Sequence, residues 1–75
     1  MTIREHDTVV LTRDLPQHSL RAGDVGAVVH VYQQGQAYEV EFVDGSGQTV
    51  ALETLDASAV RPRGAGEILH IRKVA

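Results

Sequence analysis

The sequence predicts a single all-β domain, and three observations support this prediction. Short apolar segments rich in β-branched residues recur along the 75 residues, as expected for strands. Apolar and polar residues alternate inside these segments, most regularly where Tyr38, Val40 and Phe42 share the side opposite to two glutamates. Glycine, proline and aspartate separate the segments, and these residues favour turns.

The alternating segments give the order of the elements along the chain. The expected strands are residues 7–13, 25–32, 37–43, 48–54 and 60–62. The expected turns are residues 33–36 and 44–47, with a single 3-10 turn at 55–59. The first connection, residues 14–24, is long, and we expect Leu15 and Leu20 to fold back beneath it. Gly26 lies inside the second strand and indicates a bulge or a sharp bend there.

Five short strands with a long first loop and a 3-10 turn before the fifth strand describe an SH3-like small barrel. Closure of such a barrel removes the exposed edges of its sheet. We expect the barrel in residues 1–63. Residues 64–75 are expected to form a second unit, in which a flexible glycine-rich hinge leads into an extra C-terminal strand or arm at residues 67–74.

Composition limits both the cellular setting and the partners. The chain has no cysteine, so disulfides are excluded and a reducing cytoplasm is the expected location. No apolar stretch approaches the roughly 20 residues that a membrane span requires, and the polar first residues do not resemble a signal peptide. We therefore expect no membrane association. Seven basic and ten acidic residues give a net charge of −3, which argues against a strong nucleic-acid binder.

The residues that could perform chemistry are scattered along the chain. The four histidines lie in different segments without the short spacing of a metal-binding motif, and no serine lies in a nucleophile elbow. Glu39 and Glu41 would lie about 6–7 Å apart on one strand face, near the carboxylate separation of glycosidases. A solvated strand face gives the same pattern, and so small a barrel has no deep cleft. We predict a non-enzymatic protein without metal or cofactor.

A family resemblance is carried by residues 10–16, 23–32 and 38–44, which read VLTRDLP, GDVGAVVHVY and YEVEFVD. Together they resemble a family of small bacterial proteins known as a domain of unknown function, over about residues 7–62. The resemblance implies an SH3-like barrel and a bacterial source. Some members are encoded beside toxin-like or other uncharacterised genes, and the resemblance thereby implies an antitoxin- or immunity-like partner protein. It implies no catalytic residue, and the chain after Pro62 lies outside it.

Large apolar side chains gather near the end of the sequence, where water would leave them as an aggregation hazard. They need a surface, which could be their own barrel, a second copy of the chain or another protein. We predict binding to a protein partner or self-association by strand addition, in which backbone hydrogen bonds provide affinity. The predicted partner-binding residues are Ile68, Leu69, Ile71, Val74, Leu15 and Tyr32.

An alternative function is nucleic-acid binding, because the Gly-Asp-x-Gly-x-Val motif is also similar to ribosome-associated small barrels. The residues that would serve are Arg4, Arg13, Arg21, Arg72 and Lys73 for phosphates, and Tyr32 and Tyr38 for base stacking. Four basic residues in the last fifteen positions could form a basic edge for an acidic partner, but solubility and protection of an exposed strand edge explain them better. Nucleic acid is the less favoured partner, because the chain is acidic and contains one phenylalanine and two tyrosines as its aromatic residues.

Overall fold

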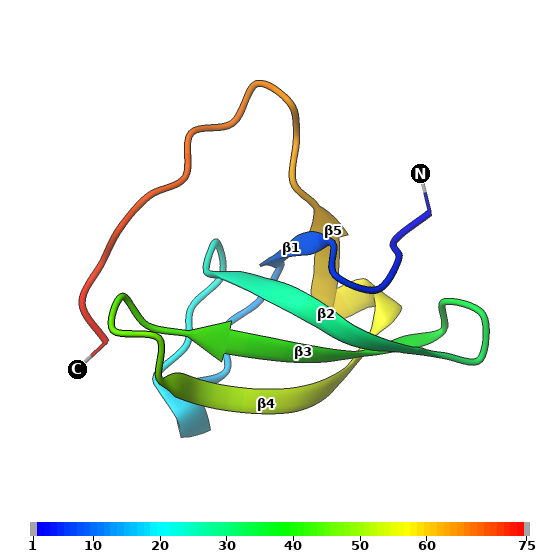
Figure 1. Cartoon of the computed structure of the whole chain (residues 1–75), viewed down its shortest axis with the longest axis horizontal. Coiled ribbons are helices and arrows are strands. Elements are labelled where there is room, and N and C mark those ends of the chain that lie inside the picture. Colours follow the sequence, from blue (N-terminus) through cyan, green and yellow to red (C-terminus); the bar gives the residue numbers. More distant parts are fainter. Residues whose placement is uncertain (1, 75) are drawn as a thin grey trace.

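The fold is described by a computed structural model, which covers residues 2–74 (Figure 1). Its strands are β1 (Thr8–Leu11), β2 (Val25–Tyr32), β3 (Ala37–Val43), β4 (Thr49–Asp56) and β5 (Val60–Pro62), with 3-10 turns η1 (Pro16–His18) and η2 (Ala57–Ala59). These elements confirm the all-β prediction and its five strands. Residues 2–74 contain no helix long and apolar enough to cross a membrane. The ends of the two predicted units, Met1 and Ala75, lie outside the described residues.

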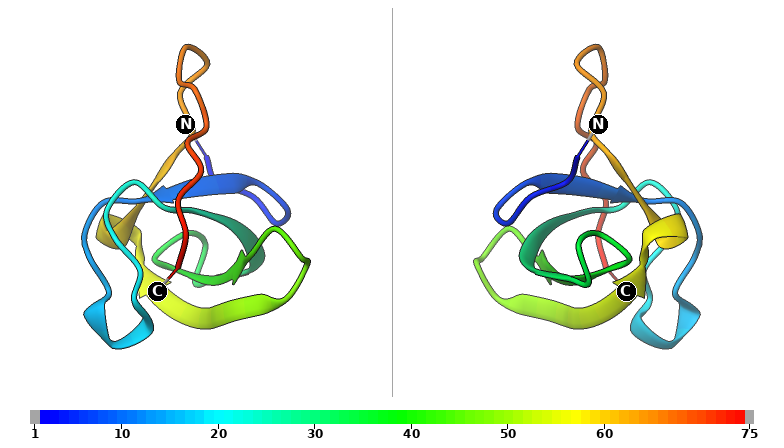
Figure 2. Two further views of the ribbon diagram at one scale, coloured as in Figure 1. Left: turned by 90° about the vertical axis from the view of Figure 1, so that its left-hand side faces the viewer. Right: turned by 90° about the vertical axis from the view of Figure 1, so that its right-hand side faces the viewer.

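All five strands belong to one antiparallel sheet with the order β4-β3-β2-β1-β5. Apolar residues face one another across neighbouring strands: Val28 pairs with Val40, and Tyr38 pairs with Leu55. Such cross-strand pairs stabilise a sheet and fix its register. The sheet is strongly curved, so that β1 and β4 lie on opposite sides of the molecule (Figure 2).

The predicted barrel is not confirmed, because the sheet is not closed. In residues 2–74, β4 and β5 are the two edges of the sheet and do not pair with each other. The short turn η2 connects these edges. Asp56 caps it by accepting the Ser58 N–H at 2.9 Å, and the Thr12 N–H donates to the Ala59 carbonyl at 2.8 Å. The bond from Thr12 ties η2 to the end of β1.

The inward-facing positions of the strands form one hydrophobic core. Val9, Leu11, Val28 and Val40 are its most completely buried side chains, and burying each of them stabilises the fold by about 1.5–3 kcal/mol. As expected, β3 alternates between buried apolar residues and partly exposed glutamates. This alternation directs one face of β3 to the core and places its two glutamates on the outer face.

The long first connection folds back on the core, as expected. Leu15 and Leu20 form an isolated β-bridge, and both side chains are buried. The turn η1 lies between them and begins with Pro16, at a position where a missing N–H costs no hydrogen bond. The connection ends at Asp24, whose carbonyl accepts the Leu11 N–H at 2.8 Å. This bond fixes Asp24 beside the end of β1.

The prediction of a bulge at Gly26 is wrong. Gly26 pairs with Val9 in regular register, and the irregularity of β2 lies between Val28 and His30. Close packing explains the glycine, because a Cβ at this position would lie 2.6 Å from Val40 Cγ1. A glycine inside a strand indicates either a bulge or a close approach of another group, and the sequence does not separate the two.

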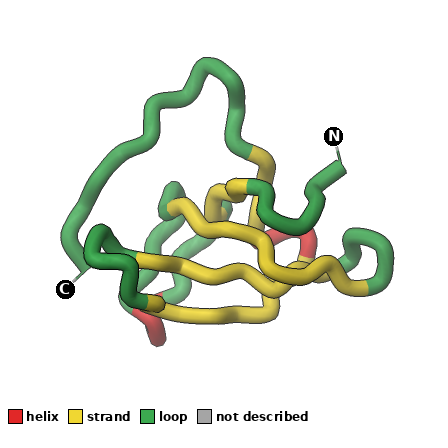
Figure 3. Tube along the Cα trace, viewed as in Figure 1, coloured by secondary structure: helices red, strands yellow, loops and turns green. Residues whose placement is uncertain are grey.

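The extra C-terminal strand predicted at residues 67–74 is also wrong. Figure 3 shows the chain after β5 as loop. It leaves the sheet, turns at Ala65 and Gly66, and returns toward the turn between β3 and β4 (Figure 1). In the described chain, no backbone hydrogen bond joins residues 68–74 to another segment. A strand requires a hydrogen-bonded neighbour, and alternation in a sequence indicates only the capacity to pair.

Candidate functional site

The chain after β5 forms a strap, by which we mean residues 63–74. Figure 2 shows that it stands apart from the curved sheet at its start and approaches the sheet again at its C-terminal end. The strap contains most of the residues predicted to bind a partner. Two sets of side-chain contacts hold it, one near each end, and we call them the first and second anchors.

The first anchor closes the turn at the start of the strap. Arg61 in β5 donates to both carboxylate oxygens of Glu67, each at 2.7 Å. Glu67 also accepts the Gly64 N–H at 2.5 Å, and its own N–H donates to the Gly64 carbonyl at 3.1 Å. The Arg61 guanidinium, assisted by the Gly64 N–H, lowers the pKa of Glu67 to about 2. The predicted hinge is therefore a turn with defined hydrogen bonds.

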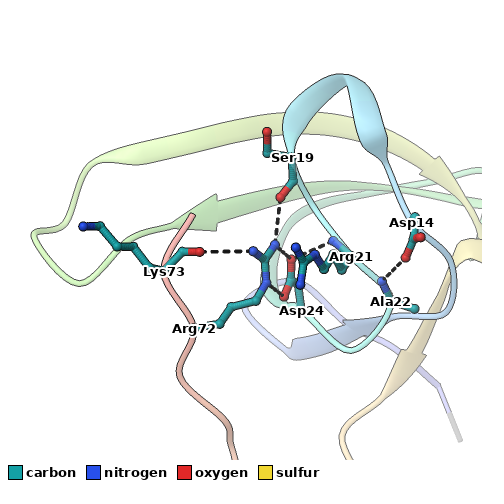
Figure 4. Close-up of polar contacts among 7 residues, drawn as sticks. All are labelled: Asp14, Ser19, Arg21, Ala22, Asp24, Arg72 and Lys73. Atoms are coloured by element: carbon teal, nitrogen blue, oxygen red, sulfur yellow. Dashed lines mark hydrogen bonds and ion pairs between the residues drawn. The ribbon is translucent and has the colours of Figure 1, made fainter. Parts of the chain in front are cut away.

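The second anchor fixes the far end of the strap to the first loop (Figure 4). Arg72 donates through Nε to Asp24 Oδ1 at 2.8 Å. One terminal nitrogen of its guanidinium donates to Asp24 Oδ2 at 2.5 Å and to the Ser19 carbonyl at 2.8 Å. The Arg72 side chain is 23% exposed and the Asp24 side chain 17% exposed. Water and salt therefore screen this pair less than a fully exposed ion pair.

Asp24 is oriented for this contact by its own loop. Its Oδ2 accepts the Arg21 N–H at 2.8 Å, while Asp14 accepts the Ala22 N–H at 2.9 Å in the same loop (Figure 4). The hydrogen bonds from Arg72 lower the pKa of Asp24, against the opposing effect of burial and with help from the Arg21 N–H. Asp24 is therefore a carboxylate at neutral pH and a fixed counterion for Arg72.

Between the anchors, the strap presents apolar side chains to solvent. Ile68 is 93% exposed, Ile71 is 92% exposed and Leu69 is 54% exposed, whereas Val74, which follows the second anchor, is half-buried. Exposed apolar residues that cluster in this way mark interaction surfaces more often than singly exposed ones do. The backbone of the same residues is unpaired in the described chain. Unpaired backbone and apolar side chains are the two features that strand addition uses.

A groove of about 690 Å³ separates the strap from the sheet. Its lining includes Leu20, Val25 and Phe42 on the sheet side and Leu69, Ile71 and Arg72 on the strap side. The strap is thus held by its anchors without filling the space beneath it. Leu69 and Ile71 border this groove while remaining largely exposed.

The other two predicted partner-binding residues lie away from the strap. Leu15 is 7% exposed and belongs to the core, so its side chain does not reach the surface. Tyr32 is exposed at the end of β2, where its ring packs edge-on against His30 with ring centres 4.6 Å apart. Its hydroxyl donates to Glu39 at 3.3 Å. The structure therefore does not bring Leu15 and Tyr32 together with the apolar residues of the strap.

The candidate acid–base residues make pairwise contacts. Glu39 and Glu41 each accept a threonine hydroxyl on the sheet surface. His18 lies 3.0 Å from Glu53, and a second histidine–glutamate pair involves His30. In residues 2–74, no three histidine, aspartate or glutamate side chains lie close enough together to hold a metal ion. The groove beneath the strap is lined by none of these side chains: His18, His30, Glu39, Glu41 and Glu53.

Several residues of the nucleic-acid alternative are engaged within the chain. Arg13 pairs with Asp56 at 3.2 Å, and Arg72 belongs to the second anchor. Tyr38 is buried in the core, so its ring is not available for stacking on a base. Arg21, Arg72 and Lys73 line one small pocket, and Tyr38 lies apart from them in the core.

The anchoring roles of Arg61, Glu67, Asp24 and Arg72 were not predicted from the sequence. The first anchor had a local signal, because opposite charges stand on either side of the Gly-Ala-Gly segment. The second anchor had no local signal, because Asp24 and Arg72 are 48 positions apart. The alternating pattern of the strands does not predict the position of either residue. The exposure of Ile68 and Ile71 follows from these two anchors, which hold the segment away from the core.

Comparison with known proteins assigns a family to the sheet. The model of a family described as Domain of unknown function (DUF4926) matches residues 5–62. This range contains all five strands and ends where the strap begins. Comparisons with curated proteins and with solved structures gave no match.

Proposed function

Because the chain belongs to the family described as Domain of unknown function (DUF4926), a description that assigns no activity, we propose its function from its own surface. We propose that it is a non-enzymatic protein-binding module. The curved sheet is the scaffold, and the strap is the binding element. The residues that would contact the partner are Ile68, Leu69, Ile71 and Val74.

One observation carries this proposal: two isoleucines are almost fully exposed in a segment that is held near both ends. Ile68 and Ile71 lie between the first and second anchors. A freely moving tail could bury such side chains by collapsing onto the sheet, whereas the anchored strap keeps them in water. Burying each one against a partner is worth up to about 1.5–3 kcal/mol before ordering costs are subtracted.

The proposed mode of binding is strand addition. A strand of the partner would lie beside the strap and satisfy its unpaired backbone groups, and the exposed isoleucines would set the register. The sequence favours a reducing bacterial cytoplasm as the setting. In that setting, a small partner of the antitoxin or immunity type fits this mode.

Protein is placed ahead of nucleic acid because the strap exposes three large apolar side chains, Ile68, Leu69 and Ile71, and because the chain carries a net charge of −3. Nucleic-acid binding relies on lysine and arginine contacts to phosphates and weakens steeply as salt rises. Titration of the chain with RNA and DNA at low salt should therefore be flat. Tight, salt-sensitive binding would reverse the order of the two proposals.

Site-specific photo-crosslinking in cells tests the proposed function. A photoreactive residue replaces Ile68 in one variant and replaces Ala27, which is exposed on β2, in the control. We expect a discrete crosslinked protein with the Ile68 variant and none with the control, and we expect Ile71→Ser to weaken the crosslink. Equal labelling from both positions, or no crosslinked protein from Ile68, would contradict the proposal.

A further inference from the structure

We propose that the strand bound by the strap is the strap of a second copy of this chain, paired antiparallel with His70 opposite His70 of the second copy. This inference rests on the proposed function, because it identifies the partner of the same segment. It makes the protein a homodimer whose two-fold axis passes through the middle of the paired straps.

The backbone of the strap is free to pair along most of its length. After the turn at Ala65 and Gly66, residues 67–74 contain no further turn or bend, and the strap follows a curved path back toward the sheet (Figure 1). Within the described chain, the N–H of Glu67 makes the one backbone–backbone hydrogen bond of these residues. An extended segment with unpaired backbone groups is a template for another strand. The same segment of a second copy offers matching unpaired N–H and C=O groups.

The side chains favour one register for self-pairing. In an antiparallel pair, residues directly opposite each other lie on the same face and interact. With His70 opposite itself, Leu69 faces Ile71 of the second copy, and Glu67 faces Lys73 of the second copy. Each pair occurs twice by symmetry. One face of the paired straps therefore has an apolar centre with opposite charges at both ends.

Neighbouring registers lose this complementarity. A pair centred on Leu69 places Glu67 opposite Ile71 of the second copy. A pair centred on Ile71 places Leu69 opposite Lys73 of the second copy. Each of these registers places a charged side chain opposite Leu69 or Ile71, and neither aligns Glu67 with a basic residue. In the register centred on His70, Ile68 lies opposite Arg72 of the second copy on the other face, and its preference rests on the Leu69–Ile71 and Glu67–Lys73 pairs.

The anchors of each copy remain intact in the proposed pair. Arg72 keeps its contact with Asp24 of its own chain, and Glu67 keeps Arg61. The Lys73 ammonium makes no ion pair among the described residues, so it can approach Glu67 of the second copy. Pairing thus adds contacts without breaking those that position the strap.

Two paired straps form a small interface. Stable protein interfaces bury about 1,200–2,000 Å² in total, and smaller ones belong to weak or transient complexes. We therefore expect a dimer that dissociates on dilution. Its formation should be visible in the concentration dependence of the mass.

Disulfide trapping tests the register, because the chain contains no cysteine. The Cα atoms of opposite residues lie about 4.5–5.5 Å apart in an antiparallel pair, within the range that a disulfide spans. We expect His70→Cys to form a covalent dimer under mild oxidation about ten-fold faster than the control variant Ile68→Cys. In the control, the two cysteines are four residues out of register and about 13 Å apart.

Equal oxidation rates at the two positions would overturn the proposed register, and slow oxidation at both would overturn the dimer. Sedimentation of variants without cysteine gives a second measurement. Lys73→Glu places like charges opposite each other and should lower the dimer fraction. Arg63→Glu changes the net charge equally outside the pairing and should not. Equal effects of the two substitutions would count against the proposed pairing.

This experiment separates the inference from the function on which it rests. Slow trapping at His70, together with crosslinking from Ile68 to a different protein, would overturn the second copy as partner and leave the strap as the binding element. Slow trapping without any crosslink from Ile68 would overturn both proposals.

Discussion

The contact between Arg72 and Asp24 shows how a single pair of side chains can position a segment that forms no secondary structure. Asp24 is fixed through its backbone to β1 and through its carboxylate to the Arg21 N–H. The Asp24 side chain therefore loses little further conformational freedom when it binds Arg72. Sequence reasoning identified the apolar residues of the strap from their type and spacing. It did not find this contact, since no periodic pattern connects residues that are 48 positions apart.

Replacing Asp24 with asparagine should release the far end of the strap. Asparagine retains an oxygen for the Arg21 N–H but loses the charge that Arg72 binds, and hydrogen bonds to charged groups contribute about 1.5–3 kcal/mol. We expect trypsin to cleave the native protein after Arg72 about ten-fold faster, as measured by mass spectrometry. Asp14→Asn removes the same charge from the same loop and serves as the control. Equal cleavage of the two variants would show that Asp24 does not hold the strap.

Removing the guanidinium of Arg61 should raise the pKa of Glu67. The folded pKa of about 2 lies below the ordinary value of 4.5, so the carboxylate stabilises the turn above pH 4.5. This contribution is lost as the pH falls toward 2. In Arg61→Gln the midpoint should move up toward 4.5, as measured by NMR titration of the Glu67 carboxyl. Arg63→Gln is the control and should leave it near 2. A midpoint near 4.5 in the unsubstituted chain would contradict the first anchor.

At the scale of elements, the alternation of apolar and polar residues predicted the strands well wherever the chain provides an adjacent strand to pair with. The range 37–43, with its strict alternation, coincides with β3, and β2 and β5 also match their expected ranges. Residues 67–74 have a similar apolar content but no adjacent strand, so they remain loop. A strand forms only where two segments pair. The alternating pattern of residues 67–74 therefore could not show that they have no neighbouring strand.

Gly26→Ala should destabilise the sheet where β2 crosses the core. The added Cβ would meet Val40 Cγ1 at 2.6 Å and Phe42 Cε1 at 2.9 Å, and overpacking of this kind costs about 1–3 kcal/mol. Urea unfolding measures the loss. Gly45→Ala is the matched control, because nothing lies within 4 Å of its Cβ position, and its effect should stay within about 0.5 kcal/mol. Equal free energies of unfolding for the two variants would mean that β2 and β3 accommodate the added methyl group at Gly26 without loss of stability.

For the whole molecule, the structure divides into a sheet that contains the core and a strap that lies outside it. The core consists of residues from Ile3 to Val60, and the family match ends at residue 62. Composition and spacing were sufficient to predict the sheet and to single out Ile68, Leu69, Ile71 and Val74. The groove and the anchors depend on where the strap returns, and that position is set by contacts distant in sequence.

Light scattering of the full chain beside a chain that ends at Gly64 tests most directly whether the strap joins two copies. The shortened chain keeps every core residue, so we predict that it unfolds cooperatively and retains the mass of a monomer at all concentrations. The full chain should rise from 8.1 kDa toward twice that mass as its concentration increases. A full chain that keeps its monomer mass of 8.1 kDa at every concentration, as the shortened chain keeps its own, would contradict the account.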